Sequence, residues 1–157
     1  MVFNASGLNY SNFQPELESQ EYAACNFQLN SKKVIFRLAK ITPKKVGHFA
    51  SIWKRNKKRV TQPFELSDDI DYFLIATRQQ DYFGLFIFSK FVLHEHKILS
   101  DKTRDGKRGF RVYPPWDLTT NKQARKTQQW QIKYFLELPI EKSIDIEKAK
   151  LLFNIES

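Results

Sequence analysis

Three segments of the sequence combine basic side chains with aromatic and amide side chains: FRLAKITPKK, GKRGFRVYPPWD and NKQARKTQQWQ. Lys and Arg neutralise phosphates, Asn and Gln bond to the backbone or to base edges, and aromatic rings stack on bases. This combination favours a surface that binds nucleic acid. We expect phosphate contacts from Arg37, Lys40, Lys45, Lys54, Arg108, Arg111 and Lys126, and base contacts from Trp116 and Gln128.

Acidic residues beside lysine raise a second possibility, metal-dependent cleavage of the phosphodiester bond. Enzymes of that kind bring two or three carboxylates to Mg²⁺, usually with a lysine nearby. The order acid, any residue, lysine occurs at Glu95-His96-Lys97 and at Asp105-Gly106-Lys107, and Asp71 would supply a further carboxylate. Because 27% of the residues are charged, such triplets arise easily by chance. A nuclease with Mg²⁺ as its cofactor is therefore the alternative to a binding protein.

The other reactive side chains form no metal-binding or nucleotide-binding motif. His94 and His96 lie two residues apart with no cysteine or third histidine near them, and Cys25 is the single cysteine. The five glycines are not clustered into a phosphate-binding loop. We expect no resident metal, and no cofactor apart from the Mg²⁺ of the nuclease alternative.

The net charge of +9 is concentrated in two blocks of the sequence. Residues 22–64 carry eleven basic side chains and no acidic one, and residues 82–136 carry eleven basic side chains against four acidic ones. The segment 65–81 between them carries five acidic side chains and one basic side chain. A polyanionic partner explains such one-signed blocks, because it is attracted to them and releases counterions on binding. The alternatives are a basic face that the acidic segment neutralises, and a module that binds an acidic protein.

Length and composition predict one compact domain over residues 1–157. The chain is 41% hydrophobic and 15% aromatic, which excludes an intrinsically disordered protein, and a single cysteine excludes a disulfide scaffold. No apolar run reaches the roughly 20 residues that span a bilayer, and the first residues lack the order of a signal peptide. We expect a cytoplasmic protein that binds DNA or RNA and has no membrane partner. Composition does not choose between the two nucleic acids or set the oligomeric state.

Hydrophobic spacing and turn residues predict the elements that position these side chains. Helices are expected at 15–24, 43–56, 121–138 and 145–153, and strands at 27–29, 34–39, 71–77, 82–89 and 110–113, with 91–93 as an edge strand. In the helix at 43–56, Val46, Phe49, Ala50 and Trp53 form an apolar stripe. The predicted fold class is α/β (α+β), with a short mixed central sheet flanked by helices.

Five segments resemble the MepB family of bacterial proteins, in the same order and from about Glu21 to Phe135: FRLAKITPKKVGHFASIWKR, DDIDYFLIA, FGLFIFS, GKRGFRVYPPWD and NKQARKTQQWQIKYF. That family takes its name from an operon that also holds a multidrug efflux pump and a transcriptional regulator. The resemblance implies a topology similar to that of restriction or tRNA endonucleases, an α-β-β-β-α core. The core would consist of residues 43–56, 71–77, 82–89, 109–113 and 121–138.

The third strand of this implied core departs from the pattern of active enzymes. In active enzymes of that topology the acid-x-Lys signature lies on the third strand, where this chain has Phe110-Arg111-Val112. The two acid-x-Lys triplets lie outside that strand. This departure favours a domain that binds nucleic acid without cleaving it.

Overall fold

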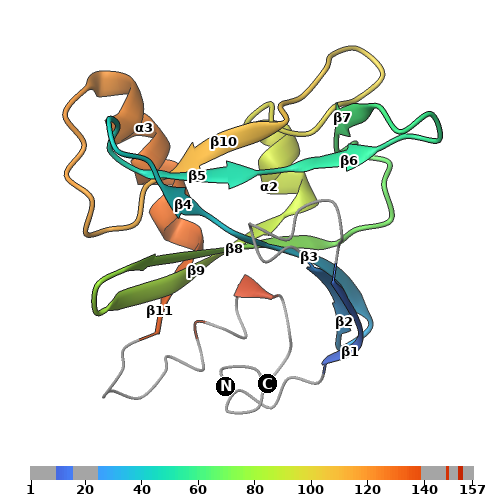
Figure 1. Ribbon diagram of the computed structural model, residues 1–157, viewed down its shortest axis with the longest axis horizontal. Helices are drawn as coiled ribbons and strands as arrows, with labels where there is room; N and C mark the ends of the chain where they lie inside the picture. The colour runs from blue at the N-terminus through green and yellow to red at the C-terminus, as the bar shows by residue number, and fades with distance from the viewer. Residues whose placement is uncertain (1–9, 16–24, 139–147, 149–151, 154–157) are drawn as a thin grey trace.

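A curved six-stranded sheet forms the centre of the molecule, and a smaller sheet packs over one of its faces (Figure 1). The computed structural model describes residues 10–15, 25–138, 148, 152 and 153. The strands of the large sheet, in spatial order, are β1 (Tyr10–Pro15), β2 (Cys25–Leu29), β3 (Lys32–Leu38), β8 (Tyr72–Gln79), β9 (Tyr82–Ser89) and β11 (Phe135–Glu137). Neighbouring strands are antiparallel except for β3 and β8, which are parallel, so the sheet is mixed.

The smaller sheet and a separate hairpin lie over the large sheet. The smaller sheet has the order β10 (Gly109–Val112), β5 (His48–Ser51), β4 (Lys40–Ile41), and the hairpin consists of β6 (Trp53–Arg55) and β7 (Thr61–Pro63). The chain enters the smaller sheet directly from β3, through Ala39, whose N–H donates to the Ala76 carbonyl of β8 at 2.9 Å. The two sheets are therefore continuous at this corner.

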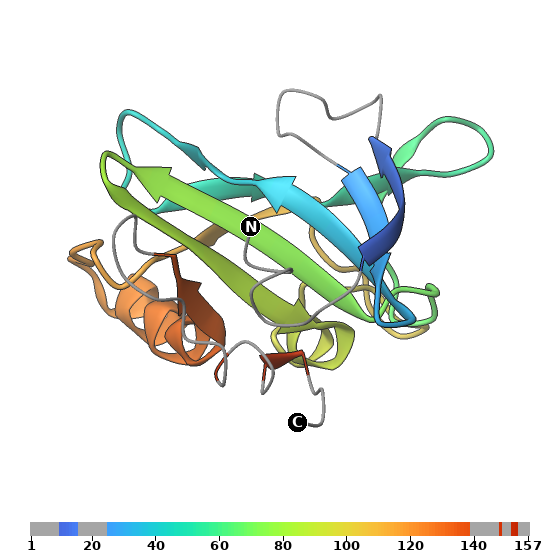
Figure 2. The same ribbon diagram turned by 90° about the horizontal axis from the view of Figure 1, so that it is seen from below.

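Within residues 25–138 two α-helices flank the sheets, and each begins with a side-chain cap. Helix α2 (Lys90–Glu95) follows β9 directly, and the Ser89 hydroxyl accepts a hydrogen bond from the Val92 N–H. Helix α3 (Lys122–Gln131) begins at Asn121, whose side-chain oxygen accepts from the Ala124 N–H at 2.8 Å. It continues through a 3-10 turn, η2 (Ile132–Tyr134), into β11. Figures 1 and 2 show α3 beside β10 and β11, and α2 at the end of β9.

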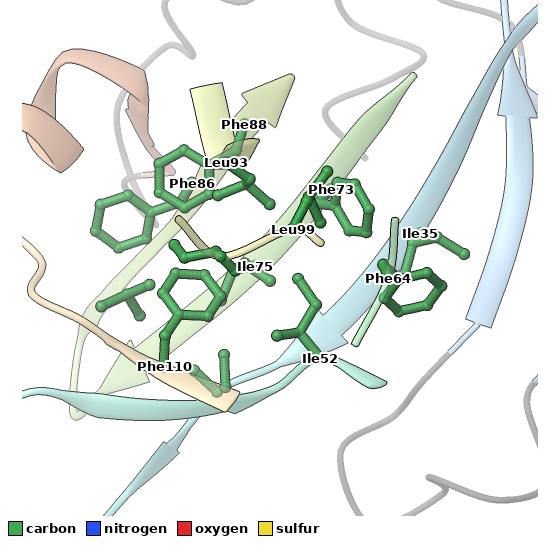
Figure 3. Close-up of a cluster of buried hydrophobic side chains, with 14 of the residues drawn as sticks. Ile35, Ile52, Phe64, Phe73, Ile75, Phe86, Phe88, Leu93, Leu99 and Phe110 are labelled. Atoms are coloured by element: carbon green, nitrogen blue, oxygen red, sulfur yellow. The ribbon is translucent and has the colours of Figure 1, made fainter. Parts of the chain in front are cut away.

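Both faces of the large sheet are buried, because successive side chains of a strand point to opposite sides. On one face Phe73 and Ile75 belong to the same buried cluster as Phe110 of the smaller sheet, and Figure 3 shows this cluster between the two sheets. On the other face Leu74 belongs to a cluster that includes Phe153. The continuous apolar runs of β8 and β9 are explained by this burial on both sides.

A single α+β domain with a mixed sheet and two helices is confirmed, and the strands predicted at 27–29 and 34–39, and at 71–77 and 82–89, pair as two hairpins. Strands β2 and β3 are joined by Asn30 and Ser31, whose φ angles of 47° and 70° are those of a tight hairpin turn. Strands β8 and β9 pair along their whole length, from Tyr72 opposite Ser89 to Gln79 opposite Tyr82.

The helix predicted over residues 43–56 is wrong. Its apolar stripe follows helical spacing, yet residues 48–51 and 53–55 are strands, and Gly47 has a φ of 93° that no helix residue adopts. β5 pairs with β4 on one side and with β10 on the other, so partners distant in the sequence outweigh the local periodicity. Val46, predicted to face the core, is 41% exposed.

This correction also changes the endonuclease core that the family resemblance implied. Strands occupy the place of its first helix. The strand assigned third, β10, pairs with β5 in the smaller sheet, whereas β9 has β8 and β11 as its neighbours. The order of elements predicted for that core is therefore not the order of this fold.

Four further element predictions are changed or lie outside the described residues. Residues 91–93 belong to α2 instead of an edge strand, because Ser89 caps a helix there. The helix expected to reach residue 138 ends at Gln131, since Phe135–Glu137 pair with β9. The helix expected at 15–24 falls on residues that the structure does not describe, apart from Pro15 in β1, and the one at 145–153 is described only at three positions. Within the described ranges, no helix is long and apolar enough to cross a membrane.

Candidate nucleic-acid interface

A groove of about 700 Å³, here called the basic groove, lies between α3, β10 and the turn that precedes β5. Its lining includes the aromatic side chains of Phe110, Tyr113 and Trp130. Four cationic side chains also line it: Lys44, Lys45, Lys107 and Arg111. Among the described residues that line the groove, none is acidic. The two basic blocks of the sequence therefore meet here, and the local charge is positive.

Arg111 holds the turn that carries Lys44 and Lys45 against β10. Its Nη2 donates to the Thr42 hydroxyl at 2.7 Å, and its Nη1 donates to the Gly47 carbonyl at 3.4 Å. The guanidinium thus contacts both ends of the turn from the neighbouring strand. Arg111, predicted to bind phosphate, has a structural role in addition to its charge.

His96 and Trp130 form one side of the basic groove. Their rings are stacked, with centroids 3.7 Å apart and an interplanar angle of 5°. Burial lowers the pKa of His96; the Glu95 carboxylate opposes this change in pKa and the Lys133 ammonium adds to it. The imidazole is therefore neutral over more of the pH range than a free histidine, and it carries a positive charge only in acid.

The acidic segment neutralises other lysines of the first basic block. Lys54 Nζ lies 2.6 Å from an Asp68 carboxylate oxygen and 3.6 Å from a Glu65 carboxylate oxygen, and Lys33 pairs with Asp69. Lys54, predicted to bind phosphate, is thus occupied by two carboxylates. Segment 65–81 therefore neutralises part of the first basic block. Its carboxylates pair with Lys33 and Lys54, and not with the lysines that line the basic groove.

The nine predicted nucleic-acid contacts are dispersed over the fold. Only Lys45 and Arg111 line the basic groove. Arg37 is fully buried and donates to the Phe36 carbonyl at 2.9 Å, so it presents no charge at the surface. Arg108 is exposed and donates to the Thr61 carbonyl at 3.1 Å. Lys40, half-buried in β4, and Lys126, exposed on α3, also lie outside the groove, as do Lys54, Trp116 and Gln128.

Gln128 and Trp116, predicted to contact bases, belong to one loop arrangement. The Gln128 amide donates to the carbonyls of Pro114 and Asp117 at 2.9 and 3.0 Å, and accepts from the Thr119 hydroxyl at 3.2 Å. It therefore shapes the loop that carries Trp116. The Trp116 ring is half-buried against the core, and its Nε1 donates to the Gln79 side chain at 3.2 Å.

The side chains proposed for a nuclease lie on several different elements of the fold. Over the described ranges, no three His, Cys, Asp or Glu side chains are grouped so that they could hold a metal ion. Asp71 accepts a hydrogen bond from the Lys33 N–H at 2.8 Å where β8 begins. Glu95 ends α2, with Lys97 just beyond it, and Asp105 lies in the loop before β10, while Lys107 alone among these residues lines the basic groove.

Five residues that were not among the predicted nucleic-acid contacts lie at or beside the groove. Lys44, His96, Trp130 and Gln131 line it, and His48 lies in an adjoining cavity. The segment FRLAKITPKK contains Lys44 beside the predicted Lys45, and the segment NKQARKTQQWQ contains Trp130 and Gln131. No motif pointed to His48, whose burial depends on the pairing of β5 with β10.

Comparisons with known proteins agree on one family. The sequence model described as MepB-like matches residues 16–137. A solved structure titled "Crystal Structure of MepB" is similar to this chain at a TM-score of 0.79 and 35% sequence identity, over 85% of this chain and 89% of that chain. No curated protein gives a significant match. The family resemblance read from the sequence is confirmed, and the chain belongs to the MepB-like family.

Proposed function

We propose that this protein binds nucleic acid through the basic groove, without a catalytic step of its own. One observation carries the proposal: Lys44, Lys45, Lys107 and Arg111, from distant parts of the sequence, line one groove in which no described side chain is acidic. A one-signed concave surface of this kind attracts the phosphate backbone and releases its counterions.

Neutral groups of the groove support the same proposal. The Asn121, Gln123 and Thr127 side chains of the α3 wall supply hydrogen-bonding groups, and Trp130 supplies an aromatic surface. Amides and hydroxyls bond to phosphate, sugar or base edges, and aromatic rings stack on bases. The absence of a described carboxylate cluster is the reason that the proposal contains no cleavage step.

The test measures binding to labelled single-stranded DNA, duplex DNA and RNA between about 50 and 300 mM salt. We expect the affinity to fall steeply with salt, because each phosphate contact contributes about 0.7 to 0.9 to the logarithmic slope. The variant Lys44→Ala/Lys107→Ala should lose about tenfold or more in affinity. Its logarithmic salt slope should be smaller by about 1.4 to 1.8, the contribution of two phosphate contacts.

A matched control removes two charges elsewhere. Lys57 and Lys58 are exposed in the turn between β6 and β7, which Figure 1 shows on the opposite side of the molecule from α3. Lys57→Ala/Lys58→Ala should change the affinity by less than about twofold, because charges farther than a Debye length from a bound phosphate are largely screened from it. Binding that is absent, independent of salt, or equally weakened by both double variants contradicts the proposal. A partner retained after nuclease treatment would identify the basic face as a protein-interaction module instead.

A further inference from the structure

We propose that a cavity beside the basic groove receives one unstacked nucleobase of the bound strand, an inference that rests on the proposed function. The cavity, here called the base pocket, has a volume of about 390 Å³ and lies between the turn before β5, the β8–β9 turn and the loop that carries Trp116. Lys45 and Val46 line both the base pocket and the basic groove. A strand whose phosphates occupy the groove therefore passes the mouth of the pocket.

Two buried polar groups line the base pocket without being satisfied by the protein. His48 is 1% exposed, and neither ring nitrogen has a hydrogen-bond partner among the described residues. Its Nδ1 lies 3.4 Å from Asp117 Oδ2, within reach of an ion pair but not aligned for a hydrogen bond, and that oxygen has no described hydrogen-bond partner either. Unsatisfied buried polar atoms are rare in native proteins, and these three belong to two side chains that line one cavity.

Aromatic rings form a wall of the base pocket. The Tyr82 ring stacks on Trp116, with centroids 5.2 Å apart and an interplanar angle of 19°. The hydrogen bond from Trp116 Nε1 to the Gln79 side chain fixes the orientation of the indole. Base–aromatic stacking is the main contact through which proteins hold single-stranded bases.

The rim of the base pocket is unusually apolar for a surface. Four of the seven exposed large hydrophobic side chains among the described residues line this one cavity: Ile41, Val46, Tyr82 and Leu118. Leu118 is 81% exposed, and the Asp117 side chain next to it in sequence is 11% exposed. A ligand must therefore combine apolar faces with a polar edge.

A nucleobase has these properties, and the polar groups indicate which bases fit. The faces of the ring would contact the aromatic and apolar side chains, while its edge would bond to the Asp117 carboxylate, beside which His48 lies at 3.4 Å. The Asp117 carboxylate accepts hydrogen bonds, so it favours a base with an exocyclic amino group, as carboxylates do when they accept from cytosine. Unstacking costs least in a single strand, which makes single-stranded nucleic acid the substrate class.

The experiment compares two strands with the same phosphates. One is a single strand of about 12 adenine and cytosine nucleotides, and the other has the same length but abasic sugars throughout. The sugar is deoxyribose or ribose, whichever strand the wild-type protein binds more tightly. We expect the wild-type protein to bind the base-bearing strand about tenfold or more tightly than the abasic strand.

Two variants remove the contacts of the base pocket at positions that are not buried in the core. Tyr82→Ala removes half of the stacked pair, and Asp117→Asn removes the acceptor charge without changing the shape of the side chain. Each should bind the abasic strand as the wild type does, which also shows that it is folded, and should lose most of the preference for the base-bearing strand. Phe91→Ala is the control, because Phe91 is 66% exposed and lies outside this pocket. It should keep the preference.

The outcomes separate the two proposals. Equal wild-type affinity for both strands, or a preference that survives Tyr82→Ala and Asp117→Asn, overturns the base pocket and leaves binding in the basic groove standing. No binding to either strand overturns the proposed function and the base pocket with it. Loss of the preference in Phe91→Ala as well would show that the preference does not arise from the pocket, and would overturn it.

Discussion

Gln131 and Tyr113 are joined by a hydrogen bond of 2.8 Å, from the Tyr113 N–H to the side-chain Oε1 of Gln131. The same amide donates through Nε2 to the Arg111 carbonyl at 2.9 Å, and the Gln131 side chain is fully buried. The last residue of α3 thus bonds to the edge of β10 as a neighbouring strand would. These two bonds fix the helix wall of the basic groove relative to its strand wall.

Replacing Gln131 by alanine should destabilise the protein. The substitution leaves the Tyr113 N–H and the Arg111 carbonyl without their partner, and a buried unsatisfied group costs about 1 to 3 kcal/mol. We expect the free energy of unfolding, measured by urea titration, to fall by about 2 kcal/mol or more. Gln129→Ala, at an exposed position of the same helix, should change it by less than about 0.5 kcal/mol. Similar values for the two variants would show that the Gln131 bonds contribute little.

Gly84→Ala should also destabilise the fold, by crowding β9 against β11. A Cβ at position 84 would lie 2.1 Å from Phe135 Cζ and 2.9 Å from the Leu136 carbonyl oxygen. Overpacking of this kind costs about 1 to 3 kcal/mol in the free energy of unfolding. If the Phe135 ring causes the clash, Gly84→Ala should cost less in a Phe135→Leu background than in the wild type, which a double-mutant cycle measures. An additive cycle would assign the cost to the backbone contact instead.

Nucleic-acid binding should tighten as the pH falls from about 7 to 5, because of His96. Burial lowers the pKa of His96 in the free protein, and a phosphate in the groove would favour the charged form and raise this pKa on binding. A rise of about one pKa unit corresponds to about tenfold tighter binding in acid. Titrations at several pH values and constant salt measure the effect.

Two variants test whether His96 is the group responsible. His96→Gln should remove the pH-dependent part of the affinity, while His94→Gln should retain it, because His94 pairs with Asp101 and does not line the groove. The free protein should respond in the opposite direction. Since the folded pKa of His96 is lowered, the unfolded chain binds the proton more readily, and stability falls as the pH drops below the ordinary histidine value of about 6.5.

Much of the large sheet was predictable because its strands are paired by short turns. Strands β8 and β9 are continuous apolar runs separated by Gln80 and Asp81, and β2 and β3 are separated by Asn30 and Ser31. Apolar runs and turn residues are local signals, so reading the sequence was sufficient there. The family was predictable as well, since the segments that resemble it are long and occur in order.

The smaller sheet was not predictable in the same way. The side chains of residues 46–53 have the spacing of a helix, and only pairing with β10, about 60 residues later, makes this segment a strand. The buried position of His48 follows from that pairing, and so does the location of Lys44 and Lys45 at the groove. A local pattern cannot reveal a partner that is distant in the sequence.

The residue pattern was sufficient to predict a single α+β domain with an excess of basic side chains in two blocks. Which of these charges act together depends on how the strands pair. Lys33 and Lys54 fold against the acidic segment, and Arg37 is buried in the core, whereas Lys44 and Lys107 come from different blocks to line one groove. The physical reason is that net charge is a sum over residues, while the field that a ligand meets depends on distances that strand pairing sets.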